Sequence, residues 1–200
     1  YTADAVRYYV NGVLQTAPTV VAGPPLVFSG ISIPAGGDAV LVYETTLNAS
    51  APLNADSTIV NTITVTGDGL TTAPTDTETI TVRAEPQLAI TKSLSPTQVM
   101  ENGQLTYTFT IENSGNTAAD AADLAAVTDT FTPPLRAISV TFNGTAWTEP
   151  TNYTYDAATG AFATVPGQIT VPAATYVQNS TTGAWTVTPG VSVLTVTGTI

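Results

Sequence analysis

The sequence contains no cysteine and no histidine. Disulfide bonds, thiolate or imidazole metal sites and catalytic triads built on a histidine base are therefore excluded. Charged residues make up only 10% of the 200 residues, against about 25% in an ordinary globular domain. The net charge is −11, with 4 basic and 15 acidic residues. Since nucleic acids and anionic membranes are bound through basic patches, we expect neither as a partner.

Longer functional patterns are missing too. No apolar run approaches the roughly 18 residues of a membrane-spanning helix, so we expect no membrane insertion. The sequence has neither a glycine-rich phosphate loop nor an evident pair of catalytic carboxylates. We therefore expect a protein that is not an enzyme and that holds no cofactor.

The sequence is rich in residues that favour β-strands. Hydrophobic residues make up 43% of the chain, enough for a core, and threonine and valine recur throughout. Turn signals such as Asn102-Gly103 and Asn143-Gly144 separate short strands. This spacing is typical of an all-β fold, and we predict Ig-like β-sandwich domains in tandem. The clearest predicted strands are Val40–Thr46, Thr58–Thr66, Thr77–Arg83, Leu88–Ser93, Leu105–Glu112, Leu124–Thr130, Ala137–Phe142, Gln168–Val171 and Val191–Ile200. We expect the alanine-rich segment Thr117–Ala126 to form a loop.

An internal repeat runs through the chain. Its first part is a strand followed by an Asn-Gly turn, and it aligns Val6, Tyr8, Val10, Asn11 and Gly12 with Ile138, Val140, Phe142, Asn143 and Gly144. Its second part aligns Pro34, Gly36, Val40 and Val42 with Pro189, Gly190, Leu194 and Val196. The second copy is longer between these two parts, and we place the insertion in a hairpin region over Tyr153–Thr182.

The part of a domain that each copy of the repeat represents predicts the domain organisation. Residues 1–83 are expected to be the C-terminal part of one Ig-like sandwich, and residues 84–87 a linker stiffened by Pro86. Residues 88–200 are expected to be a second sandwich that lacks its final strands. Such a domain would have an open sheet edge beside an exposed groove in its core, and unprotected edges recruit strands from other chains.

Three polar residues fall in phase with apolar residues on predicted strands: Lys92, Asp129 and Asn61. Because residues two apart on a strand share a face, each is expected to point into a core. Lys92 shares its face with Leu88, Ile90 and Leu94; Asp129 with Val127 and Phe131; Asn61 with Ile59, Ile63 and Val65. A lone buried charge is costly unless it is paired or neutralised. Lys92 is also the only lysine in the chain.

Several motifs resemble a conserved bacterial and archaeal surface repeat known as domain of unknown function family eleven. The resemblance to its N-terminal half lies in Leu88–Ser93, Gly103–Asn116 and Val127–Phe131, and that to its C-terminal half in Pro34–Gly37 and Ile59–Val65. Such repeats are Ig-like sandwiches in envelope, adhesin and appendage proteins. The resemblance therefore implies an extracellular or cell-surface location.

The chain is also similar to isopeptide-forming domains of pilins and adhesins. There, a lysine on the first strand joins an asparagine on the last strand, with help from a buried acid. By position, Lys92 matches the lysine, Asp129 the acid and Asn61 the asparagine. The chain departs from that pattern because Asn61 belongs to the first predicted domain and Lys92 and Asp129 to the second.

The residue types fit such an autocatalytic crosslink. Burial in an apolar core favours the neutral forms of a lysine and a carboxyl group, and fixed positioning would favour attack of the amine on the carboxamide. The alternative is structural: Lys92 extends its amine to solvent at a strand end, Asp129 caps a turn and Asn61 bonds the backbone.

Two further groups of residues are weaker candidates. Asp120 and Asp123 share a loop that could bind calcium, although a solvated acidic loop is the plainer interpretation, and we predict no metal site. Trp147, Tyr153, Tyr155 and Trp185 could line a carbohydrate-binding face, with cross-strand aromatic packing as the alternative.

These observations predict a structural subunit or repeat segment of an extracellular filament or surface appendage. Copies of the chain would join head to tail by β-strand complementation, with Lys–Asn isopeptide bonds as a further possibility. The alternative is an adhesin stalk or binding module that recognises a host or surface glycan or protein.

Overall fold

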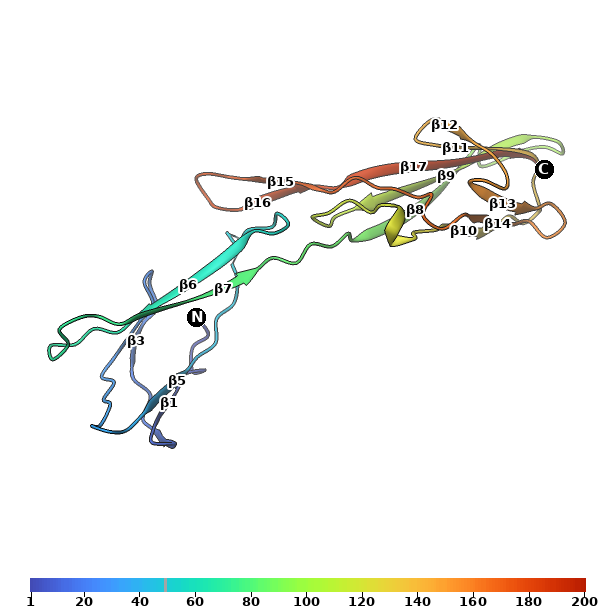
Figure 1. Cartoon of the computed structure of the whole chain (residues 1–200). Helices are drawn as coiled ribbons and strands as arrows, with labels where there is room; N and C mark the ends of the chain where they lie inside the picture. The colour runs from blue at the N-terminus through green and yellow to red at the C-terminus, as the bar shows by residue number, and fades with distance from the viewer. Residues whose placement is uncertain (49) are drawn as a thin grey trace. The chain divides into compact units, whose positions relative to one another are not determined.

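The structure is a computed structural model that describes residues 1–48 and 50–200. It divides into two compact units, Tyr1–Ala49 and Ser50–Ile200. Nearly all regular structure is antiparallel β-strand, as the sequence predicts, and the sheets are sandwich-like (Figure 1). Among the described residues, no helix is long and apolar enough to cross a membrane.

Over residues 1–48, the N-terminal unit has five short strands in two sheets. A three-stranded sheet has the order β2-β1-β5, and β3 pairs with β4. The hydroxyl of Tyr8 on β1 ties the two parts of the unit together, because it donates to Ser32 O at 2.6 Å and accepts from Ser32 N at 2.8 Å. The strands are β1 (Arg7–Val10), β2 (Val13–Gln15), β3 (Thr19–Val21), β4 (Val27–Ser29) and β5 (Ala39–Val42).

The C-terminal unit is a β-sandwich with two hairpins attached. A five-stranded sheet of order β12-β11-β17-β9-β8 and a three-stranded sheet of order β10-β14-β13 form the sandwich, while β6-β7 and β15-β16 are two-stranded ribbons. The strands are β6 (Thr58–Thr64), β7 (Thr75–Thr81), β8 (Leu88–Ser95), β9 (Gln104–Asn113), β10 (Thr128–Thr130), β11 (Arg136–Phe142), β12 (Thr145–Trp147), β13 (Tyr153–Asp156), β14 (Ala161–Thr164), β15 (Thr175–Gln178), β16 (Trp185–Thr188) and β17 (Gly190–Thr199).

The core of the sandwich follows the period of two along its strands. On β17 and β9, alternate residues are buried and the residues between them lie on the outer face. Leu194 and Val196 have no exposed surface, and Phe131 packs between the two sheets with its ring centroid 4.8 Å from that of Tyr107. Truncation of one such fully buried side chain to alanine costs about 2–5 kcal/mol.

The internal repeat appears in both units as the same three-stranded arrangement. In β1-β2 and in β11-β12, an Asn-Gly pair joins the strands, with φ of 48° and 76° at Asn11 and Gly12 and of 49° and 79° at Asn143 and Gly144. Positive φ at both central residues is the signature of the type I′ hairpin turn, which favours Asn-Gly. β5 then pairs with β1 as β17 pairs with β11.

The alignment of the second part of the repeat is wrong by one residue. Val140 pairs with Val196 on β17, whereas its counterpart Tyr8 pairs with Leu41, not with Val42. Ala39 and Leu41 are therefore the counterparts of Leu194 and Val196. A shift of one residue moves each side chain to the opposite face of the strand. Val40 and Val42 therefore lie on the more exposed face, at 48% and 50% exposure.

Other sequence-based assignments have mixed outcomes. Thr117–Ala126 forms the predicted loop, with a short 3-10 helix at Ala121–Asp123. Gln168–Val171 is not a strand, because only Val171 pairs, through an isolated bridge to Ala119. The compact units divide at residue 49, and the proposed domain boundaries at 83 and 88 stay predictions.

The turn between β13 and β14 provides a test of local stability. The Thr159 hydroxyl and the Ala158 N–H donate to the Asp156 carboxylate, at 2.8 Å and 2.9 Å, and these bonds hold the pKa of Asp156 below its ordinary value of 3.8. A lowered pKa stabilises the fold above 3.8, and that contribution is lost as the pH falls through the lowered pKa.

We expect Asp156→Ala to lower the thermal midpoint at neutral pH, and the difference from the parent protein to disappear in acid. Thermal unfolding followed by circular dichroism between pH 2 and 7 measures it. A difference that is independent of pH would contradict the role of the ionised carboxylate.

Candidate functional site

The first strand of the sandwich lies at the edge of the larger sheet. β8 pairs with β9 along one side, from Leu88 opposite Asn113 to Ser95 opposite Thr106. Its other side has no partner strand among the described residues. Unpaired backbone groups on an edge strand can receive another strand, so this edge is a potential docking site.

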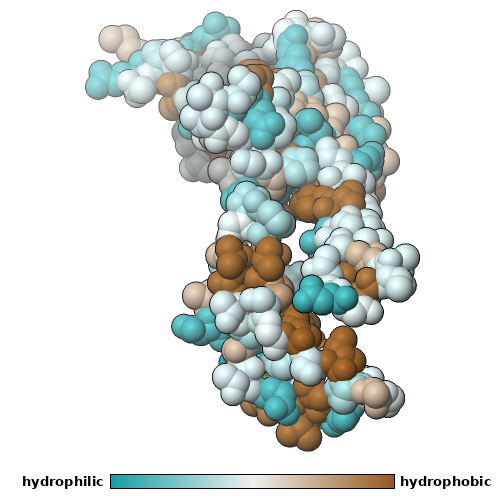
Figure 2. Space-filling model, turned by 90° about the vertical axis from the view of Figure 1, so that its left-hand side faces the viewer, coloured by the Kyte–Doolittle hydropathy of each residue, from teal (hydrophilic) through white to brown (hydrophobic). Residues whose placement is uncertain are grey.

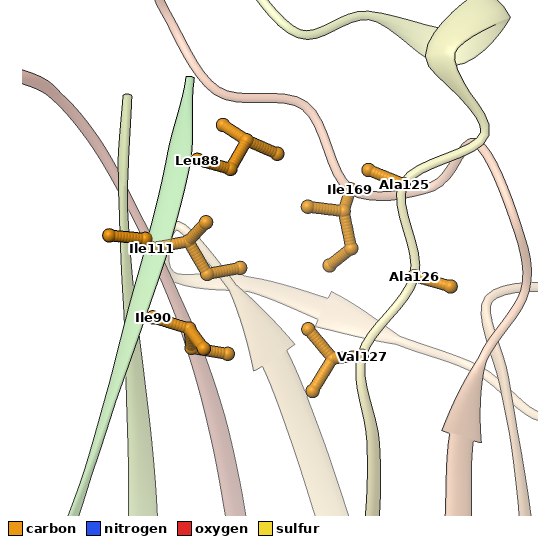
Figure 3. A pocket seen from close by; sticks show the side chains of 8 residues that line it. Leu88, Ile90, Ile111, Ala125, Ala126, Val127 and Ile169 are labelled. Carbon is orange, nitrogen blue, oxygen red and sulfur yellow. The ribbon is translucent and has the colours of Figure 1, made fainter. Parts of the chain in front are cut away.

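An apolar groove lies beside this free edge. Leu88 and Ile90 of β8 face Val127 and Ile169 across it, and Ile111 of β9 contributes to its floor (Figure 3). The groove has a volume of about 150 Å³. Val127 and Ile169 belong to the buried core, but Leu88 and Ile90 remain 43% and 52% exposed. The core of the sandwich is therefore open to solvent along β8.

Lys92 of β8 and Asp129 form an ion pair further along the same edge. Lys92 Nζ donates to Asp129 Oδ2, and the two side chains are 40% and 18% exposed. Asp129 lies on β10 in the opposite sheet, and its other carboxylate oxygen accepts from Thr130 N at 2.9 Å. The ion pair therefore bridges the two sheets across the open edge of the core.

Aromatic rings surround the lysine on its inner side. Lys92 Nζ lies 4.5 Å from the centroid of Tyr107 and 5.5 Å from those of Phe109 and Phe131. Cations are attracted to aromatic faces at such distances, so the rings hold the amine toward the core. The sequence pattern alone did not identify this aromatic environment.

The predicted inward face of β8 is confirmed, but its predicted burial is wrong. Lys92 points to the core rings and Leu88 and Ile90 line the core groove, as their shared phase requires. All three nevertheless stay substantially exposed, because no other described strand covers this edge. Lys92 and Asp129 thus form a partly exposed ion pair, and their role in a crosslink stays a prediction.

Asn61 lies elsewhere, in the ribbon of β6 and β7. It is exposed, opposite Glu78, and its predicted position inside a core is wrong. Ile63 and Val65 on the same face are also exposed, at 50% and 44%. A two-stranded ribbon has no second layer to bury a face, which explains the difference. The structure thus brings together two of the three candidate residues.

The acidic loop and the aromatic residues have structural roles in the fold. Asp120 and Asp123 form a reciprocal capping box around the 3-10 helix. The Trp147 ring stacks on Phe142 at 4.9 Å and that of Tyr153 on Phe162 at 5.5 Å, and the Tyr155 hydroxyl bonds both backbone groups of Leu135. Trp185 lies on the separate β16, so these residues do not share one sheet face.

Comparisons with known proteins provide no relative for this chain. No family model, no curated protein and no solved structure matches it. Any functional proposal therefore rests on the groove and the ion pair themselves.

The strength of the ion pair is measurable by a double-mutant cycle. We expect Lys92→Met and Asp129→Asn to show a coupling free energy of about 0.2–1 kcal/mol, since a partly exposed pair is screened by water. Denaturant unfolding of the parent protein, both single variants and the double variant measures it. A coupling of several kcal/mol would mean that the pair is shielded from water.

Proposed function

We propose that this chain is a structural repeat segment of an extracellular filament or surface appendage, assembled through β-strand complementation. The observation that carries the proposal is the open core of the sandwich beside the free edge of β8, with the Lys92–Asp129 pair at its margin. A strand added there would satisfy the backbone groups of the edge and cover the groove in one step.

Burial of apolar surface would drive this step. Leu88 and Ile90 are each about half exposed, and full burial of such a side chain is worth about 1.5–3 kcal/mol relative to full exposure. The incoming strand would also reduce the exposure of Lys92 to water. That change would strengthen the ion pair or favour its neutral form.

The chain itself contains a strand of suitable chemistry. β6 carries Ile59, Asn61 and Ile63 on one face, and its side away from β7 is unpaired among the described residues. An apolar strand with one central carboxamide complements an apolar groove that has one amine–carboxyl pair. β6 of one copy docked on β8 of the next is a head-to-tail contact that does not close, so it generates filaments.

A covalent bond could follow in such an assembly. The neutral amine of Lys92 attacks the carboxamide carbon of Asn61 in the neighbouring copy, the C–N bond to the side-chain nitrogen breaks, and ammonia leaves with the transferred proton. Asp129, which already accepts a hydrogen bond from Lys92 Nζ, would relay that proton. The product is a neutral amide that does not depend on redox conditions, which suits an acidic surface protein without cysteine.

Exposed hydrophobic residues elsewhere support a role in assembly. Val13 and Leu14 of the N-terminal unit are 62% and 57% exposed, and Val60 and Ile80 of the ribbon 58% and 63%. Hydrophobic patches are visible on the surface in Figure 2. Exposed apolar side chains of this kind are available for contacts with other protein surfaces.

A pair of variants on β8 tests the noncovalent assembly. We expect the parent protein to form oligomers that grow with concentration and Ile90→Lys to stay monomeric, because the added charge would lie in the groove. Thr91→Lys is the matched control, since Thr91 faces the opposite side of β8 and the variant has the same charge. Sedimentation velocity measures the outcome. A monodisperse parent protein at high concentration, or equal loss of assembly in both variants, would contradict the proposal.

A second test concerns the covalent bond. We expect boiled samples in detergent to show a ladder of multimers whose intact masses lack one ammonia per bond, and Lys92→Ala to abolish it. Lys92→Arg is the control: it retains the positive charge but not the nucleophilic amine, so it should abolish the ladder as well. A single band at the unmodified mass would reject the crosslink and leave the noncovalent assembly to stand on the sedimentation result.

A further inference from the structure

Asn113, the last residue of β9, and Asn116, in the loop that follows, both bind neighbouring segments through their side-chain amides. Asn113 has no exposed surface. Its side-chain oxygen accepts from Gln87 N and Gly115 N, each at 2.9 Å, and its nitrogen donates to Thr117 O at 2.7 Å and Pro172 O at 3.0 Å. Asn113 therefore fixes the start of β8 and the shape of its own loop from inside the sandwich.

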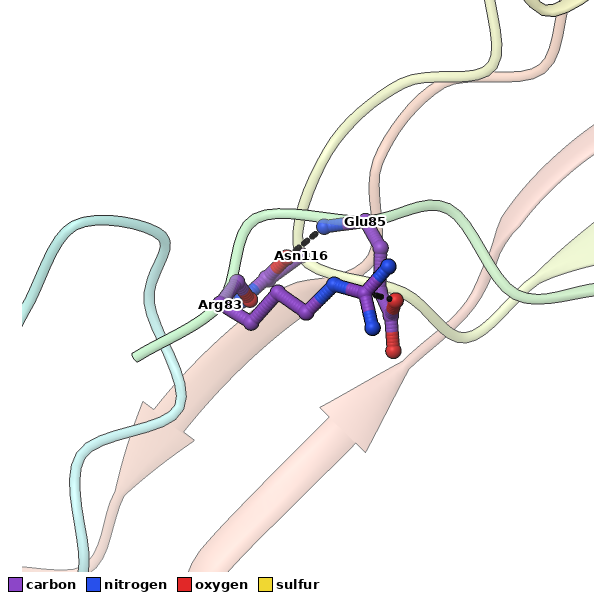
Figure 4. Close-up of polar contacts among 3 residues, drawn as sticks. All are labelled: Arg83, Glu85 and Asn116. Atoms are coloured by element: carbon purple, nitrogen blue, oxygen red, sulfur yellow. Dashed lines mark hydrogen bonds and ion pairs between the residues drawn. The ribbon is translucent and has the colours of Figure 1, made fainter. Parts of the chain in front are cut away.

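Asn116 faces the other way, toward the ribbon. Its nitrogen donates to Leu53 O at 3.1 Å and Arg83 O at 2.9 Å. Its oxygen accepts from Glu85 N at 2.9 Å (Figure 4). Leu53 precedes β6 and Arg83 follows β7. A single side chain thus bonds the two chain segments that enter and leave the β6-β7 ribbon at its open end, where Thr58 pairs with Thr81.

The packing of the loop leaves no space between it and the linker. A Cβ atom on Gly115 would collide with backbone atoms of Glu85, Pro86 and Gln87. Ser114 N donates to Gln87 O at 2.9 Å on the same side. The linker is therefore held by backbone and amide groups, whereas the exposed Arg83–Glu85 ion pair beside it adds little.

We propose that Asn113–Asn116 is a rigid joint that fixes the direction in which the β6-β7 ribbon leaves the sandwich. A two-stranded ribbon on a free linker would sample many orientations, because segments joined by a small contact move relative to one another by default. The Asn116 bonds to both chain segments at the open end of the ribbon restrict that freedom. The joint itself does not require strand complementation. In a filament assembled as proposed above, it would set the angle between successive copies.

Distances between spin labels on the ribbon and on the sandwich test the joint. The chain has no native cysteine, so Thr79→Cys on β7 and Thr154→Cys on β13, both exposed, can be labelled selectively. Pulsed electron–electron double resonance is measured on the full chain diluted with unlabelled protein. We expect one narrow distance distribution in the parent background.

Asn116→Ala should broaden this distribution about twofold or more, because both chain segments at the open end of the ribbon are released. Asn116→Asp should do the same, since a carboxylate oxygen would then face the Leu53 and Arg83 carbonyls. Asn152→Ala is the matched control: the bonds of Asn152, to Thr148 and Gln168, lie within the sandwich, so the distribution should stay narrow.

Gly115→Ala provides an independent variant that retains both asparagines. We expect it to shift or broaden the distribution, because the added methyl displaces the linker. A broad distribution in the parent background would overturn the joint. So would a distribution that stays narrow in Asn116→Ala and Asn116→Asp while circular dichroism shows both variants folded.

Discussion

The double pairing of β9 is the interaction on which the rest of the C-terminal unit depends. This ten-residue strand pairs with β17 on one side and β8 on the other. Its inward residues Phe109 and Ile111 help to form the core, and its last residue, Asn113, holds the start of β8. Weakening β9 would therefore disturb the core, the free edge and the joint together.

The larger sheet extends three strands to one side of β9 and only one strand, β8, to the other. Beyond β17, strands β11 and β12 extend the sheet, whereas β8 is its last strand and leaves Leu88 and Ile90 half exposed. This asymmetry creates the apolar groove next to the Lys92–Asp129 pair. The function that we propose follows from it, because a strand bound at this edge would bury both the groove and the pair.

Much of the local structure could be predicted from the sequence. The period of two placed Lys92 and Asp129 on inward faces, and their contact agrees with that prediction. The Asn-Gly pairs correctly marked the hairpin turns of both repeat copies. The register between β1 and β5 was wrong by one residue, because adjacent apolar residues from Ala39 to Val42 fit either face and only the pairing with Tyr8 decides between them.

The sequence by itself determined the all-β class, the faces of the strands and the absence of cysteine and histidine chemistry, since these depend on residue type and local period. Only the tertiary structure decided which of those faces are covered. Asn61 and Lys92 have the same kind of sequence pattern, but the first lies on a two-stranded ribbon and the second beside core aromatic rings. The joint at Asn116 was also invisible in the sequence, because its partners lie 63 and 33 residues away and meet it only in the folded chain.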